Sequence, residues 1–519
     1  MTDWGRFVLV VGWMGVCLAP AFGAEWPQWR GPFFNGSTQE RDLPVSWSQT
    51  ENVAWIRPLP GPSGATPVIA NGRVFVTSTV KGTPEFVALC FDAATGKELW
   101  RRQAGANPRK FPRNNMASPS PVTDGRNVFF LYGEGTLIGF DLDGRELWSR
   151  NIEKEYGNLA LQFGYSNSPV LHDGKLYITV VRRNTPYREP AADEPLDSFI
   201  AALDPATGKT LWKQPRTTDA FDEGMETYST LMPFVRDGKV ELLMTGGDFI
   251  TAHDPATGRE LWRFEYWHEK VRDSRVIPSL VTGAGLIFGS RHKYNPVFAL
   301  EPPVAWRGRP ALASRGHPGR ALSGHHEAAA VEGQGQDAHA TEERGRDAHD
   351  TQGRDALATE EQGQDASATE ECGRNARDTQ GQDALTTQGR DALGAGRILW
   401  EFAEAASDCS TPLFYDGRLY VFDGLRRRTV TCLDPKMGRI FWQGRLAGRS
   451  SWWSSPTAAD GKIYLISEAG EIAVLRAGGD EFKVLFETRF NEPPIQSSIA
   501  IAGGHLFIRT AENLYCIGK

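Results

Sequence analysis

Phe199-Ile-Ala-Ala-Leu-Asp204-Pro-Ala-Thr-Gly208-Lys-Thr-Leu-Trp212 is the stretch that decides the fold, because the chain repeats its plan. An apolar run ends at an Asp, a tight turn places a Gly four residues later, and a second run ends on Trp. Alternating apolar residues predict strands, and the Gly takes the positive φ that reverses the chain. The Trp offers a broad apolar surface and one N–H donor. Four further copies run from Phe86 to Trp100, Leu137 to Trp148, Phe249 to Trp262 and Thr429 to Trp442.

A second pattern precedes the copies of the first. It consists of a small residue or Pro, an apolar run, an Asp-Gly pair or a relative of it, and another apolar run. Asp-Gly between two apolar runs is the strongest short-range signal of a β-hairpin. Eight hairpins are predicted in this way, with turns that end at Gly72, Gly125, Gly174, Gly238, Gly285, Gly417, Gly461 and Gly504.

The two patterns together predict units of four antiparallel strands, and successive terminal Trp residues lie roughly 42–50 residues apart in the regular units. One such sheet cannot bury both of its faces, and radial stacking of several sheets forms a propeller. The last unit ends at Asn513–Ile517 with three strands, so Asn52–Trp55 is expected to supply its fourth and to leave no open edge. The sequence therefore predicts an all-β, eight-bladed β-propeller of four-stranded antiparallel blades over residues 47–519, closed by an N-terminal strand.

Two segments precede the repeats. Residues 1–24 have the features of a secretory signal peptide, with Arg6 in a polar start, an apolar core from Phe7 to Leu18 and small residues at a cleavage spacing. An uncleaved membrane anchor is the alternative, although the apolar run barely reaches the ~18–20 residues that a span needs. Residues 25–46 follow as an N-terminal extension.

Residues 303–395 interrupt the turn between the third and fourth strands of the fifth unit. Gly-Gln-Asp-Ala and close variants recur there at steps of 8 or 10 residues, as at Gly335, Gly345 and Gly353. Few apolar side chains are present, so no core can offset the entropy of ordering the segment. We predict a disordered, low-complexity insert, and a binding tail is the alternative.

Composition and charge exclude some classes of function. The chain has 40% hydrophobic residues, 55 Gly and 32 Pro, which suits many short strands and turns and does not suit a helical protein. Its net charge of −7 gives no reason to expect a nucleic-acid partner. Of the six cysteines, five follow the predicted leader and no pair has metal-ligand spacing. We predict core thiols, of which at least one is unpaired, and no metal site.

The pattern Ala-x-Asp-x-x-Thr-Gly-Lys-x-x-Trp resembles the tryptophan-docking repeat of quinoprotein-type propellers. This PQQ-like repeat family contains the pyrroloquinoline quinone (PQQ) dehydrogenases and non-enzymatic relatives, including the lipoprotein of the outer-membrane β-barrel assembly machinery. The opening Trp26-Pro-Gln-Trp-Arg-Gly is similar to that of secreted bacterial members. The resemblance implies that the repeat Trp packs between neighbouring blades, a structural role that falls to Trp100, Trp148, Trp212, Trp262, Trp400 and Trp442.

The resemblance extends less far to catalysis. The dehydrogenases of this family hold PQQ and Ca²⁺ with acidic and amide side chains and use a catalytic Asp, and many carry a disulfide between adjacent cysteines. This chain has no Cys-Cys pair and no segment that aligns with the metal-ligand motifs. Because a shared fold does not carry an activity by itself, no catalytic residue is assigned, and PQQ with Ca²⁺ is kept as an alternative.

A candidate ligand site follows from the predicted topology. In a propeller the loops that connect successive blades reach the central axis on one face, and the converging carboxylate, guanidinium, amide and indole groups have the composition of a ligand pocket. The alternative is a polar ring that only hydrogen-bonds loops and water. Arg272 or Arg275 would clamp an anion, and Trp452 or Trp453 would lie under a flat ring or a sugar. The predicted ligand-binding residues are Asn114, Asn115, Tyr165, Asn167, Glu226, Tyr228, Arg272, Asp273, Arg275, Trp452, Trp453 and Gln496.

Three functions fit these observations. The preferred one is an exported, non-enzymatic propeller that acts as a scaffold or as a module that binds a ligand or a protein. A PQQ- and Ca²⁺-dependent dehydrogenase acting on an alcohol or sugar is the alternative, and a binder of carbohydrate or another small ligand is the third. We expect a periplasmic or secreted, envelope-associated monomer whose protein or small-molecule partner is not specified by the sequence.

Overall fold

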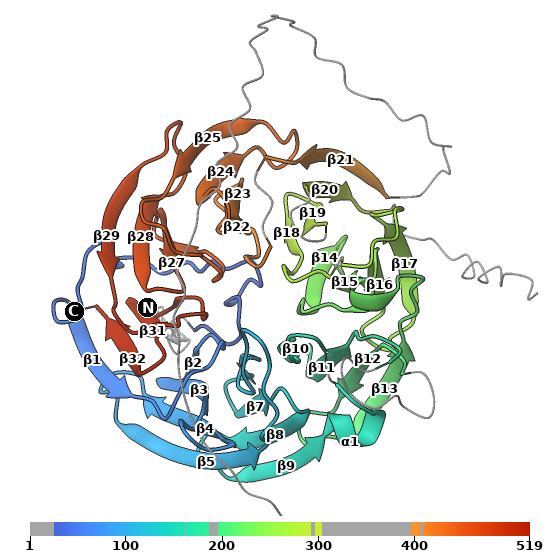
Figure 1. Ribbon diagram of the computed structural model, residues 1–519, viewed down its shortest axis with the longest axis horizontal. Helices are drawn as coiled ribbons and strands as arrows, with labels where there is room; N and C mark the ends of the chain where they lie inside the picture. Colours follow the sequence, from blue (N-terminus) through green and yellow to red (C-terminus); the bar gives the residue numbers. More distant parts are fainter. Residues whose placement is uncertain are drawn as a thin grey trace, which may run out of the picture. The chain divides into compact units, whose positions relative to one another are not determined.

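The computed structural model describes residues 25–159, 161–185, 196–273, 275–291, 296–303, 396–404 and 408–518. The predicted signal peptide and all but the first residue of the predicted insert 303–395 lie outside these residues. The described residues form eight four-stranded antiparallel sheets that follow one another around a ring (Figure 1). The predicted eight-bladed propeller is therefore confirmed. No helix in the described part of the chain has the length and apolar character that a membrane span requires.

The first four blades follow the chain without a break, and each runs from the inner to the outer strand. Blade 1 contains β2 (Val68–Ala70), β3 (Arg73–Thr79), β4 (Glu85–Asp92) and β5 (Glu98–Ala106). Blade 2 contains β6 (Val122–Thr123), β7 (Asn127–Leu131), β8 (Thr136–Asp141) and β9 (Glu146–Asn151). Blade 3 contains β10 (Val170–His172), β11 (Lys175–Val180), β12 (Phe199–Leu203) and β13 (Thr210–Pro215), and blade 4 contains β14 (Met232–Arg236), β15 (Lys239–Gly246), β16 (Phe249–His253) and β17 (Glu260–Glu265).

The remaining blades complete the ring. Blade 5 contains β18 (Val281–Gly283), β19 (Leu286–Ser290), β20 (Val297–Glu301) and β21 (Arg397–Phe402). Blade 6 contains β22 (Leu413–Tyr415), β23 (Arg418–Asp423), β24 (Thr429–Leu433) and β25 (Ile440–Arg445). Blade 7 contains β26 (Thr457–Ala459), β27 (Lys462–Ile466), β28 (Glu471–Arg476) and β29 (Val484–Arg489), and blade 8 contains β30 (Ala500–Ala502), β31 (His505–Arg509), β32 (Asn513–Ile517) and β1 (Val53–Pro58).

Blade 8 is built from both ends of the propeller sequence. Its outer strand β1 pairs with β32, with Val53 opposite Ile517 and Trp55 opposite Cys516. The prediction that the N-terminal strand closes the last sheet is confirmed. Each neighbouring pair of sheets encloses apolar side chains, so closure buries both faces of every blade.

The repeat Trp side chains lie against the turn of the following blade. Trp100 donates its Nε1–H to the carbonyl oxygen of Leu142 at 2.9 Å, and its ring covers Gly144, where an added Cβ would come within 2.8 Å. This explains why the turn needs Gly for space as well as for its φ of +77°. Trp55, Trp148, Trp212 and Trp400 repeat the arrangement on Gly96, Gly208, Gly258 and Gly438, and Trp442 donates to the carbonyl of Gly478.

Two blade junctions depart from this pattern. Trp262 packs against the core shared by blades 4 and 5, but its Nε1–H donates to Glu241 of its own blade at 2.8 Å. The residues between β20 and β21 that follow Pro303 lie outside the described part of the chain. In blade 7 the repeat position is Phe486, and Trp47 from the chain before β1 lies 5.7 Å from it between ring centroids.

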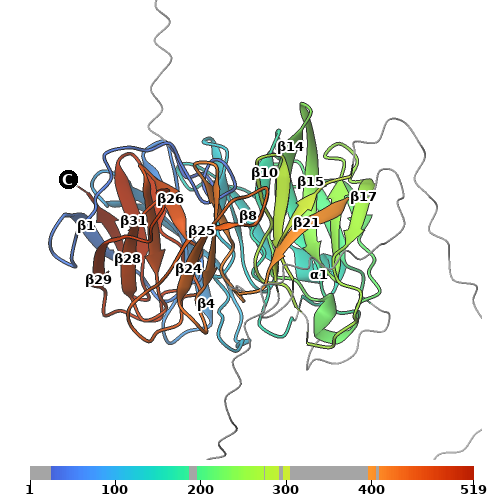
Figure 2. The ribbon, with the colours of Figure 1, turned by 90° about the horizontal axis from the view of Figure 1, so that it is seen from above.

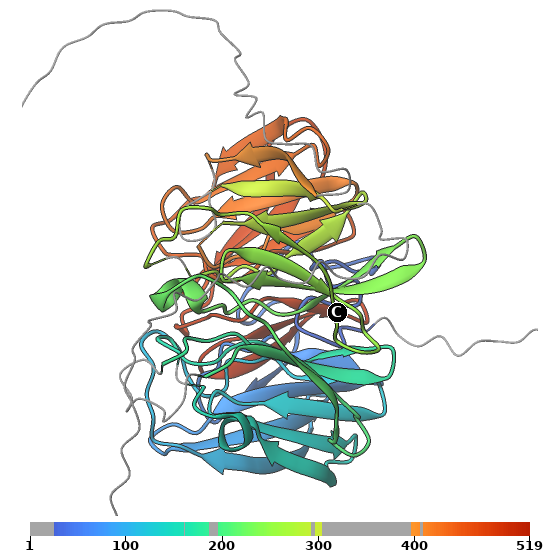
Figure 3. The ribbon, with the colours of Figure 1, turned by 90° about the vertical axis from the view of Figure 1, so that its right-hand side faces the viewer.

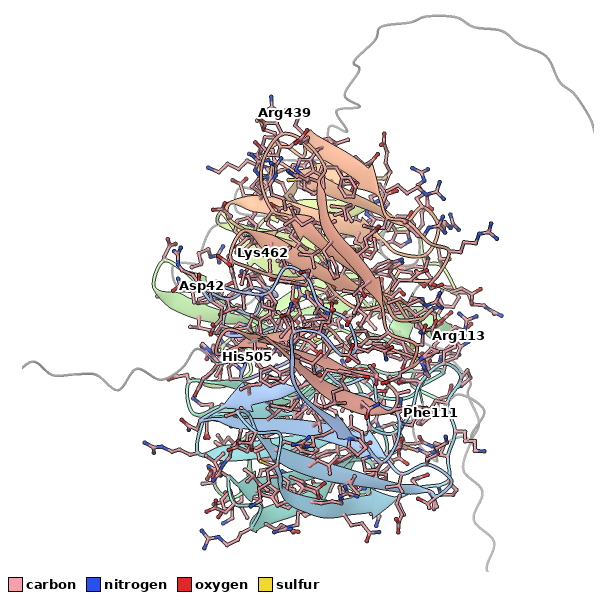
Figure 4. All side chains as sticks on the ribbon, turned by 90° about the vertical axis from the view of Figure 1, so that its left-hand side faces the viewer. Asp42, Phe111, Arg113, Arg439, Lys462 and His505 are labelled. Atoms are coloured by element: carbon pink, nitrogen blue, oxygen red, sulfur yellow. The ribbon has the colours of Figure 1, made fainter. Side chains whose placement is uncertain are left out.

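The propeller has two distinct faces. The loop face carries the connections between blades, including α1 (Ile152–Tyr156) and the 3₁₀ helix η1 (Asp222–Met225), and the loops between the second and third strands of the blades. The turn face carries the hairpin turns between the first and second strands and between the third and fourth. Figure 2 shows α1 and the projecting β14–β15 hairpin on opposite sides. Figure 3 views the ring edge-on and shows the same hairpin and the short η1 helix, both green, on opposite faces. Figure 4 places Arg113 and Phe111 on the loop face, away from Asp42, Lys462 and His505.

Candidate functional site

A cavity of about 480 Å³ lies on the propeller axis and is reached from the loop face. Its rim is formed by connections between blades, which supply Arg113, Asn114 and Trp453, and by the loop between β23 and β24, which supplies Arg426. A volume of this size is typical of pockets that hold a small organic molecule.

The foot of the cavity is a closed ring of Ser and Thr side chains, one from each blade. Each of these residues lies two positions before the first residue of the inner strand of its blade. The backbone N–H of each ring residue donates to the hydroxyl oxygen of the next, at distances from 2.8 Å (Thr230 to Ser279) to 3.3 Å (Ser498 to Thr66). Their exposed fractions lie between 2% and 8%, so these bonds satisfy buried N–H groups. The ring consists of Thr66, Ser120, Ser168, Thr230, Ser279, Thr411, Ser455 and Ser498.

The N-terminal extension forms the floor beneath this ring. Trp26 forms a β-bridge with Ile69 of blade 1, and the N–H of Thr123 of blade 2 donates to the carbonyl of Pro27 at 3.0 Å. The extension then passes the axis and pairs with blade 7, where the N–H of Ala458 donates to Gly36. Figure 1 shows this dark blue segment crossing the centre of the ring. The ring of Trp29, between these contacts, lines the cavity.

Arg30 anchors the floor to blades 6 and 7. Its guanidinium donates to the carbonyl oxygens of Pro456 at 2.8 Å and of Pro412 and Asn35 at 2.9 Å. The side chain is fully buried, and burial lowers the pKa of Arg30 to about 9. Its described partners are neutral carbonyls, and its Nε has no hydrogen-bond partner among the described residues. Arg30 is therefore a buried cation directly below the cavity, and the described residues supply no counter-charge to it.

The wall of the cavity combines aromatic rings with arginines. The Arg275 guanidinium lies 4.7 Å from the ring centroid of Phe163, and Arg113 lies 6.0 Å from that of Trp453. Arg275 pairs with Glu223 at 2.7 Å and approaches Asp408 at 3.9 Å. Burial alone would lower the pKa of Arg275, but these two carboxylates outweigh it and raise the pKa. Both rings and both cations face the space above the hydroxyl ring.

Five of the predicted ligand-binding residues line the cavity: Asn114, Tyr228, Arg275, Trp453 and Gln496. The amide of Asn114 donates to the carbonyl of Phe163 at 2.7 Å, and Gln496 donates to the carbonyl of Arg113 at 3.1 Å. The side chains at the rim are thus held by neighbouring loops. Whether any of the five binds a ligand stays a prediction.

Three predicted residues lie inside the protein instead of at the mouth. Trp452 is 2% exposed and packs edge-on against Phe422 at 5.8 Å between centroids. Tyr165 is also 2% exposed, and its hydroxyl donates to the carbonyl of Thr179. Asn167 is 1% exposed and donates to the carbonyl of Ser229. These three side chains hold the loops that surround the cavity and do not line it.

The four other predicted residues are also not part of the cavity lining. Glu226 is fully buried, forms an ion pair with Arg183 and accepts the hydroxyl of Tyr228 at 2.7 Å. Burial raises the pKa of Glu226, and the bonds to Tyr228 and Arg183 only partly oppose this shift. Arg272 is exposed and pairs with Asp222 at 2.9 Å. The remaining two also do not line the cavity: Asn115, which accepts the N–H of Ala117 at 2.9 Å, and Asp273, which is exposed.

The hydroxyl ring and the floor were missed by the sequence analysis. The signal for the ring was present, because a Ser or Thr stands at the same place before every inner strand, as in Ser120-Pro and Thr411-Pro. The extension offered no comparable signal, because a Pro- and Gly-rich segment has no periodicity that reveals its course.

The cavity does not provide the ligands that Ca²⁺ requires. Ca²⁺ takes about six to eight oxygen ligands, usually including several carboxylates. Asp408 is the single carboxylate among the described residues that line the cavity, and it faces Arg275. The described part of the chain also contains no group of three or more His, Cys, Asp or Glu side chains placed to hold a metal ion. The donor set of the described lining residues therefore does not fit Ca²⁺, the cation that the sequence resemblance implies.

Comparison with known proteins gives relatives of two kinds. Polyvinylalcohol dehydrogenases from Pseudomonas sp. and Sphingopyxis sp. (strain 113P3) are 25% and 26% identical over 193 and 197 residues. These segments cover 36% and 37% of this chain, and they span only 28% of the length of each relative. Among solved structures, BamB from Moraxella catarrhalis has a TM-score of 0.51 at 10% identity, over 89% of this chain and 99% of that chain.

A second solved structure is similar to the same degree. The quinohemoprotein alcohol dehydrogenase from Comamonas testosteroni has a TM-score of 0.54 at 11% identity, over 95% of this chain and 81% of that chain. At such identities the structural likeness shows the fold and not the activity. The family model described as outer membrane protein assembly factor BamB matches residues 34–186, 197–299 and 391–481. Since these segments make up more than half of the chain, the protein belongs to this family of PQQ-like propellers.

Proposed function

We propose that this protein is an exported, non-enzymatic propeller whose axial cavity binds a small anionic molecule. The observation that carries the proposal is the charge of the cavity wall. Arg113, Arg275 and Arg426 line it, and Asp408 supplies the one carboxylate among the described lining residues. Electrostatic complementarity between such a wall and a ligand favours an anion.

Arg113 is the cation that contributes most to this preference. Its guanidinium stands over the ring of Trp453 and forms no ion pair among the described residues. Its positive charge acts on Glu468, whose pKa is raised by burial and only partly lowered again by Arg113. By contrast, Arg275 is already balanced by Glu223 and Asp408. A ligand with a carboxylate or another acid group would supply the partner that Arg113 lacks.

Aromatic groups add a second preference. Trp29, Phe163, Tyr228 and Trp453 line the cavity with the arginines. A flat or apolar ligand body would pack against such side chains, while the acid group meets a guanidinium. The proposed export rests on the features of residues 1–24, and it predicts that the mature protein in the periplasm or medium begins near residue 25.

The alternative is a dehydrogenase, which the similarity to polyvinylalcohol dehydrogenases favours. Against it stands the donor set of the described cavity lining, in which Asp408 is the one carboxylate, whereas Ca²⁺ usually takes several. A protein-binding scaffold is the further alternative, and it would leave the cavity without a role.

Calorimetry and an activity assay separate these functions. Three probes are titrated into the purified mature protein: PQQ, which is a planar tricarboxylate, inorganic phosphate, and uncharged glucose. We expect 1:1 binding of an anionic probe that weakens with salt, no binding of glucose, and no dye-linked oxidation of polyvinyl alcohol with PQQ and Ca²⁺. Binding of PQQ that requires Ca²⁺, together with turnover, would establish the dehydrogenase instead.

A matched pair of variants tests the wall. Arg113→Met removes the unpaired cation from the cavity, and Arg439→Met removes an exposed arginine from another part of the surface (Figure 4). Arg113→Met should weaken anion binding about tenfold, as expected for a lost hydrogen bond to a charged group. Arg439→Met should leave anion binding unchanged. Glucose binding in place of anion binding, or an absence of binding by all three probes, would contradict the proposal.

A further inference from the structure

We infer that the eight-hydroxyl ring at the foot of the cavity is a subsite for an oxyanion, namely a phosphate or sulfate group. The inference deepens the proposed function, since it assumes that the cavity takes an anion, and it states where the acid group lies. The group is either a free ion or the terminal group of a larger ligand, because the chemistry that recognises it is the same.

The first argument is the unused hydrogen-bonding capacity of the ring. A hydroxyl has one donor and two acceptor sites. Each ring oxygen uses one acceptor site for the backbone N–H of the preceding blade, as Ser498 does for Ser455 at 3.1 Å and Ser455 does for Thr411 at 3.0 Å. No ring hydroxyl donates to a protein acceptor within the described part of the chain, although all eight line the cavity.

The second argument is the polarity of these free donors. A hydroxyl that accepts one hydrogen bond becomes a better donor for another. Because the N–H groups hold the oxygens in place, the O–H bonds can turn toward the axis at little cost in reorganisation. A ring of O–H donors around one axis suits a group that offers several acceptor oxygens and no hydrogens, which describes phosphate and sulfate.

The third argument is independent of the ring and concerns Arg30. Its guanidinium donates to Pro412 and Pro456, which directly follow the ring residues Thr411 and Ser455. The positive charge therefore lies immediately below the ring and is fully buried, and among the described residues one of its nitrogens has no partner and no carboxylate binds it. An anion held by the hydroxyls would provide the missing counter-charge in a medium where Coulomb attraction is strong.

The same observations disfavour other occupants. A metal cation would meet hydroxyl donors above a buried guanidinium, and the described cavity lining provides no carboxylate except Asp408. An uncharged sugar would find acceptors and donors in the ring, but it would leave Arg30 without a counter-charge. The positive charge of Arg30 below the ring therefore favours an oxyanion over a metal cation or an uncharged sugar.

The test uses two adjacent serines of similar burial. Ser498 belongs to the ring, whereas Ser497 points away from the cavity and donates its hydroxyl to the carbonyl of Arg509 at 2.9 Å. Ser498→Ala and Ser497→Ala each remove one buried hydrogen bond, so both variants should lose similar stability. Binding of inorganic phosphate and sulfate is measured by calorimetry for both variants and for the parent protein. Only Ser498→Ala should weaken it, about tenfold.

A second pair at another blade keeps the test decisive if Ser498→Ala folds poorly. Thr411→Ser retains the ring hydroxyl and should retain phosphate affinity. Thr411→Val removes the hydroxyl at nearly constant side-chain volume and should weaken phosphate binding. Unchanged phosphate affinity in Ser498→Ala and Thr411→Val would overturn the inference. If Arg113→Met alone weakens an anionic probe, the proposed function survives and the subsite does not. If no anion binds, both fail.

Discussion

The backbone N–H of Ser498 lies 3.3 Å from Oγ1 of Thr66, although 432 residues separate them in the sequence. This bond joins the last blade to the first, and seven equivalent bonds join the other neighbours. The inner circle of the propeller is thus closed by side chains, while β1 and β32 close it by backbone pairing at the outer edge.

Removing the hydroxyl at this closure should destabilise the whole ring. Thr66→Val keeps the shape of the side chain but leaves the buried N–H of Ser498 without an acceptor, which costs about 1–3 kcal/mol. Thr66→Ser keeps the acceptor and should lose much less. Chemical denaturation monitored by tryptophan fluorescence gives both values, and equal stability of the two variants would show that the closing bond contributes nothing.

The docking of Trp400 on Gly438 can be tested against a glycine with the same backbone. Gly438 and Gly461 both have φ near +67°, but an added Cβ would lie 2.7 Å from Trp400 at Gly438 and meets nothing within 4 Å at Gly461. Gly461→Ala should cost about 1–2 kcal/mol through backbone strain. Gly438→Ala should cost a further 1–3 kcal/mol, roughly, through overpacking. A similar unfolding free energy for both would argue against the docking contact.

Two adjacent indoles should separate stability from binding. Trp452 is buried against Phe422, and Trp453 lines the cavity beneath Arg113. Trp452→Ala should cost about 3–5 kcal/mol of stability, as large-to-small core substitutions do. Trp453→Ala should cost little stability and weaken an anionic aromatic probe. Thermal unfolding measures the loss of stability, and calorimetry measures the loss of affinity. If Trp452→Ala weakened binding and Trp453→Ala lowered stability, the assignment of Trp453 to the cavity would be wrong.

His253 should make the protein sensitive to mild acid. It stands where other copies have an apolar residue before the turn Asp, it is 1% exposed, and burial lowers its pKa from 6.5 to about 4. The folded state therefore binds a proton less readily than the unfolded state. Its contribution to stability is complete above pH 6.5 and is lost as the pH falls toward 4, by up to about 3 kcal/mol.

The control variant is His253→Leu, which introduces the residue found at the equivalent position of blade 3, Leu203. His253→Leu loses the bonds to Gly258 and Thr251, so its stability at pH 7 will not exceed that of the parent by much. The slope of stability against pH is the decisive quantity. It should flatten between pH 6.5 and 4 in the variant, and an unchanged slope would assign the acid sensitivity to other groups.

The blades could be predicted because their signals are local. Alternating apolar residues, Asp-Gly turns and the spacing from Asp204 to Trp212 each depend on a few neighbouring residues. The closing strand followed from counting, since a unit with three strands needs a fourth. For the candidate site the result was mixed, because the sequence led to Tyr228 and Trp453 at the cavity but also to Tyr165 and Trp452 inside the protein.

The sequence by itself determined the number of blades, their strand order and the closure of the last by the first, because repeat patterns specify local backbone geometry and pairing. Only the tertiary structure decided which side chains reach the axis. Neighbouring loop residues such as Trp452 and Trp453 point to opposite sides according to how distant loops pack against them. It also decided that the extension carries Arg30 beneath the hydroxyl ring, a position set by carbonyl groups about four hundred residues away.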